Sequence, residues 1–133
     1  MKNQSDYFKK PHTELLEKTG AFYAFSNKQF DEKKQPDTKY IHCGNGLLVP
    51  KSNRDQLLKG LEDIAIKAVA QDCKENTVKQ ICWREFANHE IQFTGDLTPV
   101  YDALYLYPFN KTTINKHYEK YYSHCCKHSD RYF

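Results

Sequence analysis

The apolar residues between Leu57 and Val69 recur on one helical face, and no other feature of the sequence constrains the fold as strongly. They are Leu57, Leu58, Leu61, Ile64, Ala65, Ala68 and Val69, spaced at i, i+1, i+4, i+7, i+8, i+11 and i+12. This is the period of an amphipathic α-helix. Ser52 followed by Asp55 is a variant of the capping box that begins helices. We therefore predict a helix from about Asn53 to Gln71 that forms the central element of the core.

The residues before this helix predict one short helix and a small sheet. Pro11–Lys18 is expected to be helical, with Thr19 and Gly20 as its stop signal. Ala21–Phe25 is rich in aromatic residues and suits a strand, whereas the charged segment Asp31–Asp37 marks a loop.

A β-hairpin is predicted immediately before the central helix. Two β-prone runs, Lys39–Cys43 and Leu47–Val49, are joined by Gly44, Asn45 and Gly46. Asn followed by Gly tolerates the positive φ angles of a type I′ turn, so these runs should pair as antiparallel strands.

The second half of the chain predicts only helices. One begins near Glu75 and ends before Thr94 and Gly95, and a short helix with Pro99 in its first turn follows, capped by Asp96 or Thr98. A third, at about residues 112–127, is amphipathic, with its apolar face formed by Ile114, His117, Tyr118, Tyr121, Tyr122 and Cys125. The sequence thus predicts a helix-rich α+β fold: a single domain over residues 1–133, with a core at about 11–109 and a C-terminal helix.

The positive charge of the chain is concentrated at its C-terminus. The net charge is +3, and residues 1–109 carry 15 Lys and Arg against 15 Asp and Glu. The last 24 residues carry Lys111, Lys116, Lys120, Lys127 and Arg131 against Glu119 and Asp130. This asymmetry favours an anionic partner, either nucleic acid or an acidic protein surface, with a merely solvated helix face as the alternative.

A basic stripe on the C-terminal helix is the candidate surface for such a partner. Lys116, Lys120, His124 and Lys127 share the face opposite the tyrosines, and Arg131 follows them. A cationic stripe of this kind can hold a phosphate backbone, and its binding would weaken steeply with salt.

The predicted helix that follows Glu75 carries two further sets of candidate residues. Glu85 and His89 lie one turn apart inside its apolar arc, so they form either a buried structural pair or the general base of a small hydrolase. Trp83, Arg84 and Asn88 could instead bind a planar anionic ligand such as a nucleotide, although Arg84 and Asn88 could simply meet solvent.

Metal and membrane sites receive little support from the sequence. His124 and His128 have the i, i+4 spacing of a weak metal site, but the paired ligand motifs of a closed zinc site are absent. We expect no cofactor. The polar N-terminus and the absence of a long apolar run predict a cytoplasmic protein that has no contact with a membrane and keeps its cysteines reduced.

Three segments together resemble a family of small uncharacterised proteins encoded by phages and mobile elements. They are Gly20–Phe30, the hairpin Gly44–Lys51 leading into a long helix, and the Phe86-Ala-Asn-His-Glu90 step followed by Thr94-Gly-Asp96. The similarity covers roughly residues 20–104 and leaves the basic tail outside. Where that family tends to have tyrosine or leucine before the Ala-Asn-His-Glu step, this chain has Arg84 and Phe86.

The resemblance implies no catalytic activity and favours interference with host defence. The leading hypothesis is a counter-defence binding protein, for example an anti-CRISPR inhibitor, that engages a host defence protein, a ribonucleoprotein or its guide RNA through the basic helix. A second hypothesis is a sponge that sequesters a nucleotide immune signal with Trp83, Arg84 and Asn88. The third is a small hydrolase that uses Glu85 and His89. Homo-oligomerisation is compatible with all three.

Overall fold

A computed structural model describes every residue of the chain, from Met1 to Phe133. The chain divides into two compact units, Met1–Ala68 and Val69–Phe133, which are described separately. The long helix α3 (Arg54–Glu75, 22 residues) begins in the first unit and ends in the second. The helix-rich α+β fold with a small antiparallel sheet and a long central helix is confirmed.

The sheet of unit 1 has three short strands in the order β1-β3-β2. They are β1 (Phe22–Tyr23), β2 (Tyr40–His42) and β3 (Leu47–Pro50), and both pairings are antiparallel. The predicted type I′ turn is confirmed, because Asn45 and Gly46 have φ of 52° and 79° and Leu47 N donates to Gly44 O at 2.9 Å.

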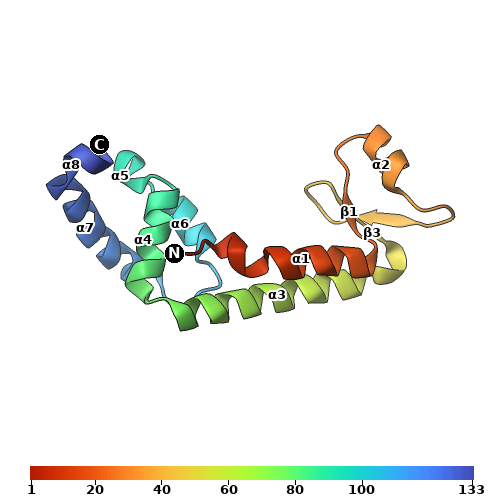
Figure 1. Cartoon of the computed structure of the whole chain (residues 1–133), viewed down its shortest axis with the longest axis horizontal. Helices are drawn as coiled ribbons and strands as arrows, with labels where there is room; N and C mark the ends of the chain where they lie inside the picture. The colour runs from red at the N-terminus through yellow and green to blue at the C-terminus, as the bar shows by residue number, and fades with distance from the viewer. The chain divides into compact units, whose positions relative to one another are not determined.

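Helices cover both faces of this sheet. On one face, Leu47 and Val49 form a buried cluster with Ala21 and Leu57. Helix α1 (Gln4–Thr19) runs beside the first half of α3 there (Figure 1), and a Cβ atom on Gly60 would come within 2.6 Å of a Leu15 methyl group. On the other face, α2 (Asn27–Lys33) packs a phenylalanine against the sheet, in an aromatic cluster formed by Phe22, Phe30 and Tyr40.

Two helix boundaries in unit 1 differ from the predictions, because polar caps rather than apolar periodicity set them. Helix α1 begins at Gln4 instead of Pro11, since Asn3 and Asp6 form a capping box that starts the helix earlier. The predicted loop at 31–37 is partly helical, because Ser26 caps α2 by accepting a hydrogen bond from Gln29 N at 3.2 Å. The 3-10 helix η1 (Lys51–Asn53) leads directly into α3.

Unit 2 is built from helices alone. They are α4 (Val78–Asn88), α5 (Ile91–Thr94), α6 (Thr98–Ala103), α7 (Lys111–Lys127) and α8 (Ser129–Tyr132). Helices α4 and α7 lie side by side (Figure 1), with the Phe86 ring packed edge-on against Tyr118 and Tyr121. The C-terminal helix predicted at about 112–127 is confirmed, and its Ile114, Tyr121 and Cys125 lie in the hydrophobic core of this unit.

The single helix predicted from Glu75 to before Thr94 is wrong. The structure breaks it at His89 and Glu90, where Glu90 takes the left-handed conformation with φ of 52°. This conformation is unfavourable for a residue with a Cβ atom. The reversal of the chain brings Ile91, which is fully buried, into the core of unit 2, and that burial offsets the cost. Gly95 ends α5 in the left-handed conformation, as the sequence predicted.

Candidate nucleic-acid interface

On α7, the lysines of the predicted basic stripe lie on the opposite side of the helix from the core residues. Its buried side chains are Ile114, Tyr121 and Cys125, whereas Lys116, Lys120 and Lys127 are exposed. The hydrophobic residues occupy one side of the helix. Because that side packs against the core, the lysines lie on the side that faces solvent. The predicted face of α7 is therefore present and open to solvent.

Two other helices extend this face. On α4, the Lys79 ammonium lies 4.6 Å from the centre of the Trp83 ring, and that ring packs 5.2 Å from the His124 ring. On α8, Tyr132 contacts the His124 ring, and the preceding residue is Arg131. We call the set Lys79, Lys116, Lys120, His124, Lys127, His128 and Arg131 the basic surface.

Burial and neighbouring positive charges both lower the pKa values of two histidines of α7, His117 and His124. Burial lowers the pKa of His124 below its usual value, and His128, Arg131, Lys79 and Lys127 lower it further. Burial, Lys120 and Lys79 lower the pKa of His117 in the same direction. Each neighbour disfavours an added proton by like-charge repulsion. Positively charged residues of α4, α7 and α8 thus lie close to His124.

The exposed side of α7 carries a shallow hollow within the basic surface. It has a volume of about 400 Å³ and is lined by Glu119, Lys120, Ser123, His124 and Lys127. One carboxylate therefore faces two lysines and an imidazole, so the lining keeps a net positive charge. A phosphate group is the kind of anion that such a lining attracts.

Arg84 does not lie at an exposed edge of its helix, where the sequence placed it. Its side chain is only 5% exposed and makes two parallel hydrogen bonds to Asp72, at 3.0 and 2.9 Å. Tyr107 donates to the same carboxylate at 2.5 Å, and Asn76 donates to it at 2.9 Å. The guanidinium is thus held inside the fold, whereas Trp83 is half-buried and packs against His124, and Asn88 is exposed.

Glu85 belongs to the same buried network, whereas His89, which the sequence predicted to be buried with it, is exposed. Glu85 accepts a hydrogen bond from Arg84 Nε at 3.2 Å and lies 3.8 Å from His89 Nε2. The nearest thiol along α4 is Cys82, and burial raises its pKa to about 12, with Arg84 opposing and Glu85 adding to the effect. A thiol with so high a pKa is a poor nucleophile at neutral pH. These contacts tie Glu85 to the buried network of Arg84 and Asp72 and leave His89 at the exposed C-terminal end of α4.

His124 and His128 are neighbours, as their spacing predicted, but their surroundings are cationic. Their ring centres are 4.6 Å apart, and His124 Nε2 lies 3.3 Å from the Tyr132 hydroxyl. Lys127, Arg131 and Lys79 all act on His124, and positive charges repel a metal cation. No three His, Cys, Asp or Glu side chains of the protein come together in a way that could hold a metal ion.

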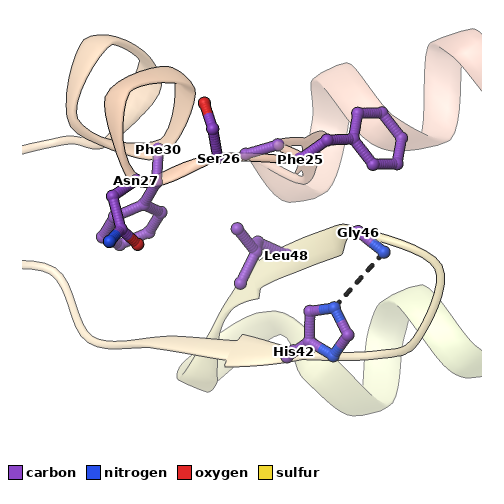
Figure 2. A pocket seen from close by; sticks show the side chains of 8 residues that line it. Phe25, Ser26, Asn27, Phe30, His42, Gly46 and Leu48 are labelled. Atoms are coloured by element: carbon purple, nitrogen blue, oxygen red, sulfur yellow. Dashed lines mark hydrogen bonds between the residues drawn. The ribbon is translucent and has the colours of Figure 1, made fainter.

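A second hollow lies in unit 1, between the start of α2 and the hairpin (Figure 2). It has a volume of about 510 Å³, with Leu48 and Phe30 among its lining and His42 at its rim. Two of its polar side chains, His42 and Ser26, already have partners within the fold. His42 Nε2 accepts from Gly46 N at 3.2 Å, and Ser26 Oγ caps α2. The hollow therefore offers a ligand few unused polar groups, unlike the basic surface of unit 2.

Two members of the basic surface were not predicted from the sequence as partner-binding residues, His128, which was a metal candidate only, and Lys79. Lys79 lies one helical turn before Trp83, so its position above that ring could have been inferred from the i, i+4 spacing. Its proximity to His117 and His124 could not, because it depends on the packing of α4 against α7. The same packing leaves Trp83 Nε1 and His117 Nδ1 buried without a hydrogen-bond partner.

No helix of the protein combines the length and the apolar character needed to cross a bilayer.

Residues 4–127 match a family described as a family of unknown function (DUF7659). The match extends beyond residues 20–104 at both ends and includes α7, which the resemblance left outside. No curated protein matches the chain. No solved structure matches it either.

Proposed function

The chain belongs to this family of unknown function, and we propose that it is a non-enzymatic binding protein that engages RNA, or an RNA-containing effector, through the basic surface of unit 2. It would act by occupying its partner and would need no cofactor. The finer proposal is that this occupancy serves counter-defence, as an anti-CRISPR inhibitor would, with a host defence ribonucleoprotein as the partner.

The observation that carries the proposal is the convergence of cationic side chains from α4, α7 and α8 around His124. Lys79 lies 4.6 Å from the centre of the Trp83 ring, and that ring lies 5.2 Å from the His124 ring. Burial lowers the pKa of His124, and His128, Arg131, Lys79 and Lys127 lower it further. Exposed cations spread evenly over a protein would not act together on one imidazole. A cluster that combines long, flexible lysines with one arginine is typical of surfaces that follow a phosphate backbone.

The two alternatives receive less support from the geometry. A nucleotide sponge built on Trp83, Arg84 and Asn88 needs an accessible guanidinium, but Arg84 already binds Asp72 with two hydrogen bonds inside the fold. A hydrolase that uses Glu85 and His89 as its general base needs the two side chains within hydrogen-bond reach, but Glu85 is buried and lies 3.8 Å from His89 Nε2.

Replacing Lys116, Lys120 and Lys127 with glutamine should weaken RNA binding and flatten its dependence on salt. Each phosphate contact that is lost should lower the slope of log affinity against log salt by about one unit. The three side chains are exposed, so the melting temperature should change little. Fluorescence anisotropy of a labelled RNA, titrated at several salt concentrations, measures the slope.

A matched control removes the same charge from unit 1. Lys9, Lys10 and Lys18 are exposed on α1, and their replacement with glutamine leaves the basic surface intact. We expect this control to keep the wild-type slope. Equal slopes for all three proteins would remove nucleic acid from the proposal.

RNA affinity should also rise as the pH falls through and below the ordinary pKa of histidine. The pKa values of His117 and His124 are lowered in the free protein, so both imidazoles are largely neutral at neutral pH. A bound polyanion favours the protonated form, and binding therefore takes up protons and strengthens with acidity. Affinities measured between pH 7.5 and 5.5 at fixed salt test this, and His124→Gln should reduce the pH dependence.

A further inference from the structure

Unit 2 exposes a cluster of three aromatic rings that its core does not use. Phe93 on α5, Tyr122 on α7 and the final residue Phe133 are 60%, 45% and 54% exposed. Phe133 contacts both of the others, at centroid distances of 5.5 Å from Phe93 and 6.5 Å from Tyr122. We call these three residues the aromatic patch. Scattered exposed apolar residues are ordinary, but three exposed rings joined through contacts of Phe133 with the other two indicate a binding surface.

The geometry of the patch leaves ring faces accessible. Phe133 meets Phe93 at 77° and Tyr122 at 85°, so each contact joins the edge of one ring to the face of another. A stacked arrangement would cover two faces at once, whereas edge-to-face contacts leave other faces open to a flat ligand. The high exposure of Phe93 agrees with this arrangement.

Helix α8 joins the aromatic patch to the basic surface. Arg131 belongs to the basic surface and Phe133 to the patch, and only Tyr132 separates them. Consecutive Cα atoms are about 3.8 Å apart, so the backbones of Arg131 and Phe133 lie within about 8 Å of each other. Tyr132 contacts His124 on one side, and Phe133 contacts Tyr122 on the other. Tyr122 lies on the opposite side of α7 from the lysine stripe, so a ligand that touches both the cations and the rings has to pass over α8, where Arg131 and Phe133 lie two residues apart.

We propose that the RNA recognised by unit 2 is single-stranded, with its phosphates on the basic surface at Lys127 and Arg131 and with bases stacked on Phe93, Tyr122 and Phe133. This inference rests on the proposed function, since it names the class of nucleic acid that the basic surface binds.

The physical basis is the difference between the two forms of nucleic acid. A duplex presents phosphates on its outside but keeps its bases stacked inside, so it can use the cations and not the rings. A single strand can turn its bases outward onto aromatic faces while its phosphates stay on the cations. Stacking is tolerant of sequence, so the proposal predicts a preference for form and no strong preference for base identity.

The test compares a single-stranded twelve-nucleotide RNA of mixed sequence with the same sequence as a duplex. The variant Phe93→Ala/Tyr122→Ala removes two of the three rings and no charge. Its control is Phe25→Ala/Tyr105→Ala, which removes two aromatic rings from outside the patch that are even more exposed, at 74% and 82%. Melting curves of all proteins establish that each variant is folded.

We expect the patch variant to lose about tenfold or more in affinity for the single strand, since each stacked base contributes measurably. Its affinity for the duplex should equal that of the wild type, and the control variant should bind both forms normally. The lysine triple variant should weaken binding to both forms.

Three results would overturn the inference. If the patch variant binds the single strand as well as the wild type does, while the lysine variant is weakened, RNA binding stands and the stacking proposal fails. If the wild type binds neither form, the proposed function fails with it. If the patch variant changes sedimentation from dimer to monomer without changing RNA affinity, the patch is a contact between copies of the chain.

Discussion

Replacing Arg84 with methionine should lower the free energy of unfolding by about 3–5 kcal/mol, because it leaves two buried carboxylates without their cation. Asp72 is fully buried, Glu85 is 3% exposed, and Arg84 hydrogen-bonds both. Methionine keeps an unbranched side chain of similar length, so the loss of charge dominates over the loss of volume. Urea denaturation followed by circular dichroism measures the effect.

The matched control is Arg54→Met on the exposed surface of α3. Arg54 lies 3.8 Å from Asp55, but the two side chains are 51% and 99% exposed. An ion pair of this kind contributes little, about 1 kcal/mol or less. If Arg84→Met and Arg54→Met cost the same, the buried network does not stabilise unit 2.

The pH dependence of the free energy of unfolding of Arg84→Met is a second test of the same network. Burial alone would raise the pKa of Asp72, but hydrogen bonds from Arg84, Tyr107 and Asn76 hold it below the usual 3.8. In the wild type, the stability that Asp72 contributes is therefore present above about pH 4 and is lost as the pH falls through the lowered pKa. Without Arg84, burial should raise this pKa, so the difference in stability between the variant and the wild type should shrink in acid.

Phe86→Ala should lower the free energy of unfolding by about 3–5 kcal/mol through the cavity that it leaves. The Phe86 side chain is fully buried, and its ring packs edge-on against Tyr118 and Tyr121 of α7. Removing it takes away two ring contacts between α4 and α7. The shift in the urea midpoint, at an unchanged slope, measures the loss.

Val78→Ala on the same helix is the control for Phe86→Ala. Val78 is 37% exposed, so its truncation removes little buried surface and creates no closed cavity. A similar small loss for both variants would mean that α4 and α7 do not form the core of unit 2. A large loss for Phe86→Ala alone would support the packing described above.

A variant can lose RNA binding through a change in the basic surface or through a change in the core of unit 2. Helix α7 supplies core residues from one side and the lysines of the basic surface from the other. A variant that loosens the core would also displace the lysines and weaken binding indirectly. Only substitutions of exposed side chains, checked by melting curves, separate the role of the surface from that of the fold.

The sequence by itself determined the elements whose signals are local. The repeat from Leu57 to Val69 predicted α3, the Gly44-Asn45-Gly46 turn predicted the hairpin, and the periodic tyrosines predicted α7 with its lysine face. Each of these rests on the conformational preference or side-chain direction of neighbouring residues, which needs no knowledge of the rest of the chain.

The tertiary structure alone decided which polar residues are buried. Arg84 falls at the edge of the apolar arc of its helix, so the sequence placed it facing solvent or a ligand. The end of α3 brings Asp72 to it, and Tyr107 arrives from after α6. Twelve residues separate Asp72 from Arg84, and 35 separate it from Tyr107. A periodicity within one helix carries no information about such partners.

The break after α4 and the extent of the basic surface also depend on residues that are distant in the sequence. Glu90 adopts its unfavourable conformation because Ile91 is buried by residues of other helices. Lys79 joins the basic surface because α4 packs against α7. Local sequence determines where a helix can form and which of its faces is apolar. The free energy of burying one element against another decides where it ends and which charges meet.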